Sequence, residues 1–84
     1  MPRRRGAPWG PDGSGGMAVY EPVSDGLHVL NASAFAIWEL CDGETGTEEM
    51  VAAIAELTGL DATVAATEVT ATVEALRALG LVET

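Results

Sequence analysis

A short helix is expected at the centre of the fold, within the stretch Leu30-Asn31-Ala32-Ser33-Ala34-Phe35-Ala36-Ile37-Trp38-Glu39-Leu40-Cys41-Asp42-Gly43. The stretch begins as the end of an apolar strand and turns at Asn31, whose side chain can accept the free N–H groups of a helix start. The apolar side chains that share one face at helical spacing are Ala34, Ile37, Trp38 and Cys41, with Phe35 at the edge of that face. Asp42-Gly43 ends the helix, because glycine adopts the left-handed conformation that other residues avoid. We expect strands before this helix and further helices after it to pack on it.

Length and charge narrow the class of protein. A chain of 84 residues, 48% of them hydrophobic, is enough for one small domain. Arg3, Arg4 and Arg5 stand together at the start, and Arg77 is the only later basic side chain, so the formal net charge is −9. An acidic surface repels phosphate groups, which nucleic-acid binders must neutralise with Lys and Arg. The charge balance therefore argues against a nucleic-acid-binding protein.

The sequence also argues against disulfides, metal sites and membrane spans. Cys41 is the sole cysteine and His28 the sole histidine, so a disulfide within the monomer is impossible and a Cys/His zinc site lacks ligands. Gly6 to Gly16 contains no apolar segment of a signal peptide, and no apolar run approaches membrane-spanning length. These features predict a cytoplasmic protein with neither metal nor other cofactor.

The two ends of the chain differ in pattern. Residues 1–16 are rich in Arg, Gly and Pro and show neither strand nor helix periodicity, which predicts a flexible N-terminal tail or a weak edge segment. Residues 17–84 are predicted to form the domain. There, Ala18 to Tyr20 and Leu27 to Leu30 flank the turn signal Ser24-Asp25-Gly26, a pattern typical of a β-hairpin.

Two more helices are predicted after Gly43. Thr45 and Glu48 form a capping box, and an apolar stripe then predicts a helix that Gly59 ends. Asp61 is the expected cap of a third helix, which Gly80 follows. The stripe of the second helix is Met50, Val51, Ile54 and Leu57, and that of the third is Ala65, Val69, Thr72, Val73, Leu76 and Leu79. Strands followed by three helices predict a small α+β domain.

Catalytic chemistry has few candidates in this sequence. His28 has no second titratable group of suitable type near it in sequence, so we interpret it as a structural strand residue rather than a general base. Cys41 lies on the apolar helix face, and the adjacent Asp42 would raise the pKa of its thiol, which argues against a nucleophile. Arg77, the only cation of the folded region, has the spacing to pair with Glu74 and is also the expected contact for a partner's carboxylate. The sequence predicts no enzyme.

A series of short motifs runs through the folded region. The series is Leu30-Asn31, Trp38, Leu40-Cys41-Asp42-Gly43, Glu68-Val69, Leu76 and Gly80-Leu81-Val82. In combination it resembles the PqqD-like family over residues 19–82. The founding member of that family serves pyrroloquinoline quinone biosynthesis. Its domain is also called the RiPP recognition element, for ribosomally made, post-translationally modified peptides.

The resemblance implies a winged-helix-like fold, in which a three-stranded antiparallel sheet precedes three helices. It also implies a peptide chaperone without catalysis. Family members hold the leader of a precursor peptide as an extra strand against the third strand, in a groove shared with the third helix. They present the peptide to a modifying enzyme, often a radical S-adenosylmethionine maturase, or to a leader peptidase. Here Ala18 to Tyr20 and Leu27 to Leu30 would be the second and third strands of the family.

The chain departs from the family's pattern at three places. The first strand of the family should precede Ala18, where Gly6 to Gly16 is a poor strand, so we expect a sheet of two strands or one completed by another chain. Gly46 stands where the family usually has Thr before the second helix, which shifts the cap. Thr72 stands where the third helix of the family often has an aromatic residue, and this smaller polar side chain would enlarge or polarise the groove.

The expected peptide site combines the edge of the second predicted strand with the third helix. No proline or lysine blocks backbone pairing within Leu27 to Leu30, so an extended peptide can add to this edge. The predicted peptide-binding residues are Leu27, His28, Val29, Leu30, Val69, Thr72, Val73, Leu76 and Arg77.

We therefore interpret the chain as a module that captures the leader of a precursor peptide and presents it to a modifying enzyme. A winged-helix nucleic-acid binder shares the fold outline, but Ala62 to Leu79 carries Arg77 alone against Glu68 and Glu74. A third hypothesis is an accessory subunit of a larger enzyme with no peptide ligand of its own, which the sequence does not separate from the first. Neither a nucleic acid nor a membrane is an expected partner.

Overall fold

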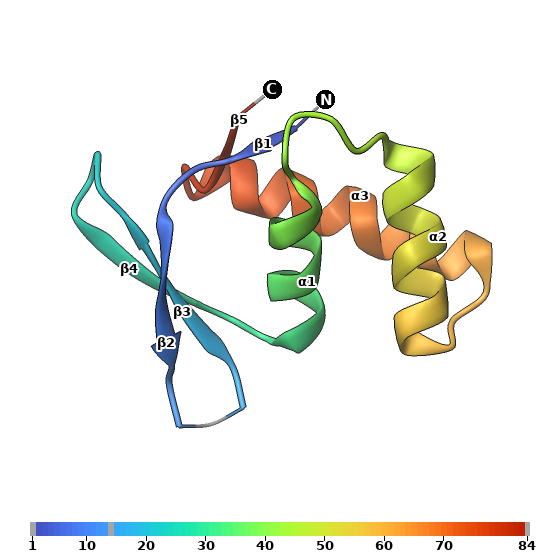
Figure 1. Cartoon of the computed structure of the whole chain (residues 1–84), viewed down its shortest axis with the longest axis horizontal. Helices are drawn as coiled ribbons and strands as arrows, with labels where there is room; N and C mark the ends of the chain where they lie inside the picture. The colour runs from blue at the N-terminus through green and yellow to red at the C-terminus, as the bar shows by residue number, and fades with distance from the viewer. Residues whose placement is uncertain (1, 14, 84) are drawn as a thin grey trace.

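The chain folds into a small sheet followed by three helices. A computed structural model describes residues 2–13 and 15–83. The elements, in order, are β1 (Arg3–Arg4), β2 (Ala7–Pro11), β3 (Met17–Glu21), β4 (Gly26–Leu30), α1 (Ala32–Leu40), α2 (Thr47–Thr58), α3 (Ala62–Ala78) and β5 (Val82–Glu83). In Figure 1 the sheet and α2 lie at opposite ends, with α1 between them and α3 running behind along most of the molecule. The predicted α+β class, with antiparallel strands before three helices, is confirmed.

The predicted hairpin is the centre of a three-stranded sheet. β3 and β4 pair antiparallel in a continuous register from Met17↔Leu30 to Glu21↔Gly26. The strand order is β2-β3-β4, so β2 and β4 are the two edges. The hairpin prediction is therefore confirmed, and each strand is slightly longer than the apolar run that indicated it.

The N-terminal segment differs from its prediction. β2 pairs with β3 from Ala7↔Tyr20 to Pro11↔Met17, with a bulge between Pro8 and Gly10, and β1 pairs with β5. Of the two alternatives predicted for residues 1–16, the flexible tail is wrong at these two strands and the weak edge segment is confirmed by β2, although residues 1 and 14 lie outside the described part. The expectation of a two-stranded sheet, or one completed by another chain, is wrong for the same reason. The prolines of β2 break the alternation of apolar and polar residues by which a strand is predicted. Proline is nevertheless tolerated at a sheet edge. That residues 17–84 form the domain by themselves stays a prediction, and the bonds of Pro2 and Arg4 to Gly43 and Cys41 now lead us to expect that this segment contributes to stability.

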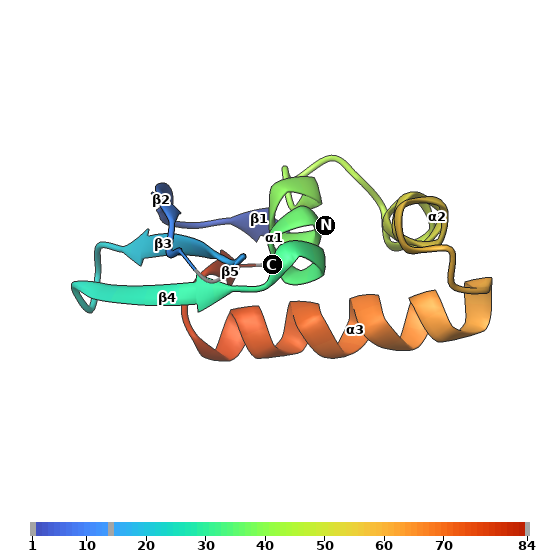
Figure 2. The same cartoon turned by 90° about the horizontal axis from the view of Figure 1, so that it is seen from below.

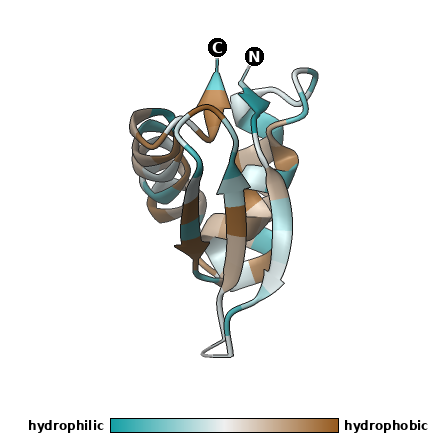
Figure 3. Ribbon diagram, turned by 90° about the vertical axis from the view of Figure 1, so that its left-hand side faces the viewer, coloured by the Kyte–Doolittle hydropathy of each residue, from teal (hydrophilic) through white to brown (hydrophobic). Residues whose placement is uncertain are grey.

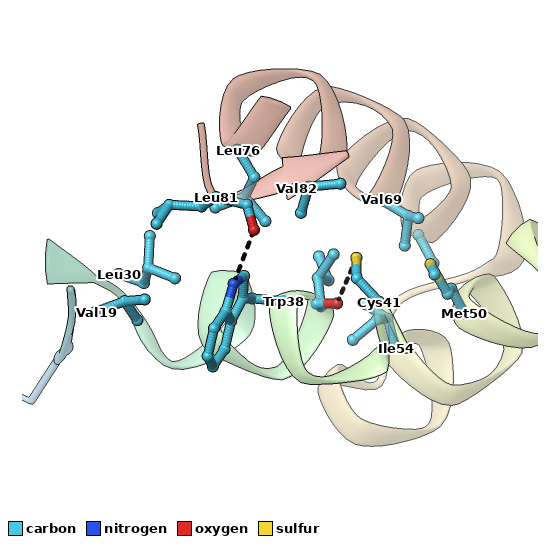
Figure 4. Close-up of a cluster of buried hydrophobic side chains, with 12 residues drawn as sticks. Val19, Leu30, Trp38, Cys41, Met50, Ile54, Val69, Leu76, Leu81 and Val82 are labelled. Atoms are coloured by element: carbon cyan, nitrogen blue, oxygen red, sulfur yellow. Dashed lines mark hydrogen bonds between the residues drawn. The ribbon is translucent and has the colours of Figure 1, made fainter. Parts of the chain in front are cut away.

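The core forms where α1 meets the three-stranded sheet, the two-stranded β1–β5 sheet and the other helices. Trp38 is its largest buried side chain, and its indole N–H donates to the carbonyl oxygens of Leu81 at 3.1 Å and Arg5 at 3.2 Å. Figure 4 shows Trp38 and Cys41 projecting from α1 into this cluster. Its members are Val19, Leu30, Ile37, Trp38, Cys41, Met50, Ile54, Ala65, Val69, Leu76, Leu81 and Val82. The core therefore joins the two ends of the chain to the central helix.

Two of the predicted helix starts are confirmed. The side chain of Asn31 accepts the backbone N–H of Ala34 at 2.8 Å, and that of Asp61 accepts the N–H of Val64 at 2.9 Å. The predicted apolar stripe of the second helix is wrong at Leu57, which is exposed near the end of α2.

The predicted capping box at Thr45 is wrong. Gly46 is the N-cap of α2 and has no side chain to supply a cap bond, while the Thr45 hydroxyl is engaged by Asp42 of the preceding loop. Asp42 accepts the backbone N–H groups of Glu44 at 2.8 Å and Thr45 at 2.7 Å, and the Thr45 hydroxyl donates to its second oxygen at 2.9 Å. These bonds hold the pKa of Asp42 below its ordinary value. The loop before α2 is therefore closed by Asp42, not by a cap at Thr45.

Candidate functional site

The outer edge of β4 lies beside α3. Figure 2 shows the strands stepping in the order β2, β3, β4 toward α3, and Figure 3 shows α3 on the side of β4 away from β3. The same view colours β4 strongly hydrophobic and β2 pale. A strand added to β4 would therefore enter the space next to the third helix.

The backbone geometry identifies which groups of β4 face outward. A Cβ added to Gly6 would collide with the carbonyl oxygen of Tyr20, so the backbone groups of Tyr20 point toward β2. Successive residues of a strand alternate in this direction, and both groups of one residue share a side. Tyr20 is paired with Leu27 and Ala18 with Val29, so Leu27 and Val29 direct their N–H and C=O groups away from β3.

The side chains of β4 alternate as the sequence predicted. Leu27 and Val29 share the outer face of the sheet and are 54% and 56% exposed. His28 and Leu30 share the opposite face, where His28 is half-buried and Leu30 belongs to the core. Two apolar side chains thus stand in solvent on the strand that also has free backbone groups.

The α3 residues that were predicted to share the peptide site do not all face β4. Val69 and Leu76 are buried in the core, and Thr72 is half-buried. Val73 and Arg77 line a concavity on another flank of α3, and no β4 residue lines it. The structure therefore separates Val73 and Arg77 from the β4 edge.

That concavity has a volume of about 510 Å³ and lies between α3 and the start of α2. Met50, Val69 and Val73 line it together with Arg77. The complete lining is Pro2, Gly46, Thr47, Met50, Val69, Thr70, Val73, Glu74 and Arg77. Among residues 2–13 and 15–83, the only ion pair joins Arg5 and Glu83 at 3.3 Å, so the expected pair of Arg77 with Glu74 is not formed. Sequence periodicity placed these residues on one helix but could not tell which neighbour each flank meets.

The turn that leads into β4 is fixed by a buried carboxylate that the sequence analysis missed. Glu21 is 3% exposed and accepts the backbone N–H groups of Val23 at 2.8 Å and Ser24 at 2.7 Å, as well as the Ser24 hydroxyl. Its bonds to Ser24 and Val23 hold the pKa of Glu21 below its ordinary value. Across the turn, the Tyr20 hydroxyl donates to Asp25, and this bond raises the pKa of Tyr20. A Glu just before a turn was the available signal.

The remaining candidates for nucleophilic and metal chemistry lie within residues 2–13 and 15–83. Cys41 is buried, and loss of solvent raises the pKa of its thiol to about 11, so a thiolate nucleophile is disfavoured. No three His, Cys, Asp or Glu side chains of the described residues are grouped to hold a metal ion. Within the same residues, no single helix is long and apolar enough to span a bilayer, and α2 and α3 meet that criterion only as a pair bent by 114°.

The family model described as coenzyme PQQ synthesis protein D (PqqD) matches residues 16–82, which includes β3, β4 and all three helices. No curated protein and no solved structure matches the chain.

Proposed function

The chain belongs to the PqqD family, and we propose that it is a non-catalytic module that binds the leader of a ribosomally made precursor peptide. In this proposal the leader adds as a strand to the outer edge of β4. The module then presents the peptide to a modifying enzyme, such as a radical S-adenosylmethionine maturase or a leader peptidase. A cytoplasmic location also stays a prediction.

The observation that carries this proposal is the free edge of β4. Leu27 and Val29 direct their backbone groups outward, and β4 contains no proline. Each backbone hydrogen bond contributes about 0.5–1.5 kcal/mol net, so the four outward groups together supply roughly 2–6 kcal/mol. Part of this is offset by the cost of ordering the peptide, so side-chain contacts must supply the remaining affinity and the specificity.

The predicted contacts divide between the strand and the helix. We propose that Leu27 to Leu30 form the pairing edge and that Thr72, on a different flank of α3 from the concavity, faces the bound peptide. Val69 and Leu76 support the site from within the core. Val73 and Arg77 would contact a peptide only if it extended around α3 to the concavity. The role of Arg77 as the partner of a peptide carboxylate therefore stays a prediction.

An amide chemical-shift titration tests the proposal. The probe is a set of synthetic leader peptides from precursor genes that neighbour the gene for this chain. We expect shifts along β4 and the adjoining part of α3. Shifts confined to α2 and the loop around Gly43, or none with any peptide, would contradict strand addition and favour an accessory subunit without a peptide ligand.

A proline scan of β4 sharpens the same test. Val29→Pro removes an outward N–H, so it should weaken peptide binding by about tenfold or more while β3–β4 pairing persists. Val29→Ala keeps that N–H and separates the backbone contribution from the side chain. His28→Pro removes an N–H that faces β3, and should instead lower the melting temperature. Equal loss of binding in Val29→Pro and Val29→Ala would show that this backbone group is not used.

A further inference from the structure

We infer that the segment bound at β4 carries large apolar side chains on its outward face, at two positions spaced two residues apart, where they pack on Leu27 and Val29. This inference rests on the proposed function of the β4 edge and specifies the class of peptide that the edge selects. The segment is an apolar strand, not one whose outward side chains are charged.

The outer face of the sheet is apolar next to the open edge. Leu27 and Val29 are more than half exposed, and their cross-strand neighbours on β3 are Tyr20 and Ala18. These side chains form two rows across the sheet, Tyr20 with Leu27 and Ala18 with Val29. Both rows stop at the edge where a further strand would continue them. An exposed apolar patch of this kind on a small protein marks an interaction site.

Strand addition fixes where the partner's side chains go. Residues directly opposite each other in neighbouring strands share a face, with Cβ atoms about 4.5–5.5 Å apart. The partner residues opposite Leu27 and Val29 therefore lie on the outer face and continue the two rows. The partner residue between them, opposite His28, points to the inner side, toward α3.

On the inner side, the exposed apolar contact that the described residues offer is limited to Leu79, which is 41% exposed and follows Thr72 by seven residues, so it shares the flank of Thr72. Leu30, Val69 and Leu76 are already buried by the chain's own core, and Thr72 presents a hydroxyl. A charged outward side chain on the partner would be placed against Leu27 or Val29 and lose part of its hydration without a partner group. The outer face therefore favours peptides with apolar outward side chains over peptides with charged ones, although this face is exposed to solvent.

The experiment is a selection from a randomised heptapeptide library displayed on phage against the immobilised chain. We expect enrichment of peptides with Val, Ile, Leu, Tyr or Phe at positions i and i+2. Amide shifts of Leu27 and Val29 with the enriched peptides would place them on β4. Leu27→Thr with Val29→Thr should weaken their binding by about tenfold, because two apolar cross-strand pairs are lost. Thr retains strand propensity, so the melting temperature should change little.

Leu60→Thr is the matched control, since Leu60 is 39% exposed in the loop between α2 and α3, which Figure 1 shows at the end of the molecule away from the sheet. It should leave binding of the enriched peptides unchanged, and equal weakening by this variant would overturn the inference. Enriched peptides that shift β4 but tolerate Asp or Lys at both outward positions would overturn the inference and leave the proposed function standing. No shift of β4 with any peptide would overturn both. Sedimentation as a dimer that buries Leu27 and Val29 would assign the patch to a second copy of the chain and also overturn the inference.

Discussion

The two edges of the sheet differ in the groups that they offer to another strand. On β4 the outward-facing positions are Leu27 and Val29, each with a backbone N–H. On β2 the register and the bulge place Pro8 and Pro11 at the outward-facing positions, and proline has no N–H to donate. The sheet therefore has one edge that can pair fully and one that cannot.

Under the proposed function, this difference lets a small sheet bind a strand without polymerising. A sheet with two open edges could propagate pairing from one molecule to the next, whereas proline and a bulge at one edge stop such growth. The bulge between Pro8 and Gly10 also breaks the regular spacing of β2. The capacity for pairing is confined to β4, next to α3.

Removing the blocked edge should have the largest effect. Deleting residues 2–11 removes β1 and β2 and leaves β3 as a new edge. It also removes the partners of backbone groups near the core, including the Arg4 N–H that donates to the carbonyl of buried Cys41 and the Pro2 carbonyl that accepts from the Gly43 N–H at 2.9 Å. Each buried group left unpaired costs about 1–3 kcal/mol, so we expect the melting temperature to fall by at least about 10 °C or cooperative unfolding to be lost. Calorimetry checks this, and an unchanged transition would show that residues 17–84 fold independently.

Truncating the largest buried side chain should come next. Trp38→Ala should cost about 3–5 kcal/mol, the usual range for a large buried aromatic. For a domain of this size, that is a large share of the total stability. Trp38→Phe retains most of the packing but not the bonds to Leu81 and Arg5, and should cost less. Denaturant unfolding measures the stability of both variants. A Trp38→Ala protein that is as stable as the wild type but no longer binds the peptide would show that Trp38 belongs to the binding surface.

The turn before β4 should weaken in acid. Because the folded-state pKa of Glu21 is depressed, its contribution to stability is present above its ordinary pKa and is lost as the pH falls through the lower folded value. Glu21→Gln should therefore melt below the wild type near pH 7, and the gap should close below about pH 4. Thermal melts of both proteins from pH 2.5 to 7 test this. A gap that widened in acid would contradict the assignment.

Opening the blocked edge should have a smaller effect on stability but a visible effect on association. Replacing Pro8 and Pro11 by Thr restores two outward N–H groups on β2. We expect a melting temperature within a few degrees of the wild type, together with concentration-dependent self-association in sedimentation. The matched variant with Val29→Pro added should still associate through β2 while losing peptide binding. A strictly monomeric Pro8→Thr, Pro11→Thr protein would show that the bulge alone closes this edge.

Reversing the charge in the concavity should have the smallest effect on stability. Arg77→Glu should shift the melting temperature by no more than about 2 °C, since an exposed charge without an ion pair contributes little. The effect of Arg77→Glu on peptide affinity shows whether the bound peptide extends from β4 to the concavity. Unchanged affinity would confine the peptide to the β4 side of α3, whereas a loss that is sensitive to salt would place a peptide carboxylate at the concavity.

Local signals in the sequence predicted most of the fold. Asn31 and Asp61 were readable as helix caps, since each side chain bonds to the backbone N–H three residues later. The hairpin was readable from Asp25-Gly26 between two apolar runs. Contacts between residues that are far apart in the sequence could not be predicted from local signals. β2 is a strand because β3 pairs with it, and only Trp9 and the two prolines of Ala7–Pro11 favour an extended conformation.

The candidate site was predictable for the strand and less so for the helix. Alternation along Leu27 to Leu30 predicted the correct faces. On α3, Val73 belongs to the same predicted stripe as Leu76, and Arg77 follows Leu76 directly, but a stripe does not indicate that one of its borders meets α2 and Pro2. Thr45 was misassigned because Asp42, three residues earlier, competes for the same hydroxyl. In each of these cases the sequence did not indicate which of two neighbouring segments the side chain contacts.

The pairing of β1 with β5 has a consequence for how this domain is carried in proteins. Arg3 lies opposite Glu83, so the two ends of the described chain leave the domain side by side, as Figure 1 shows. They leave it away from the outer edge of β4. A larger polypeptide can therefore accept the domain as an insertion within one of its surface loops, or as a fusion at either end, without blocking the pairing edge.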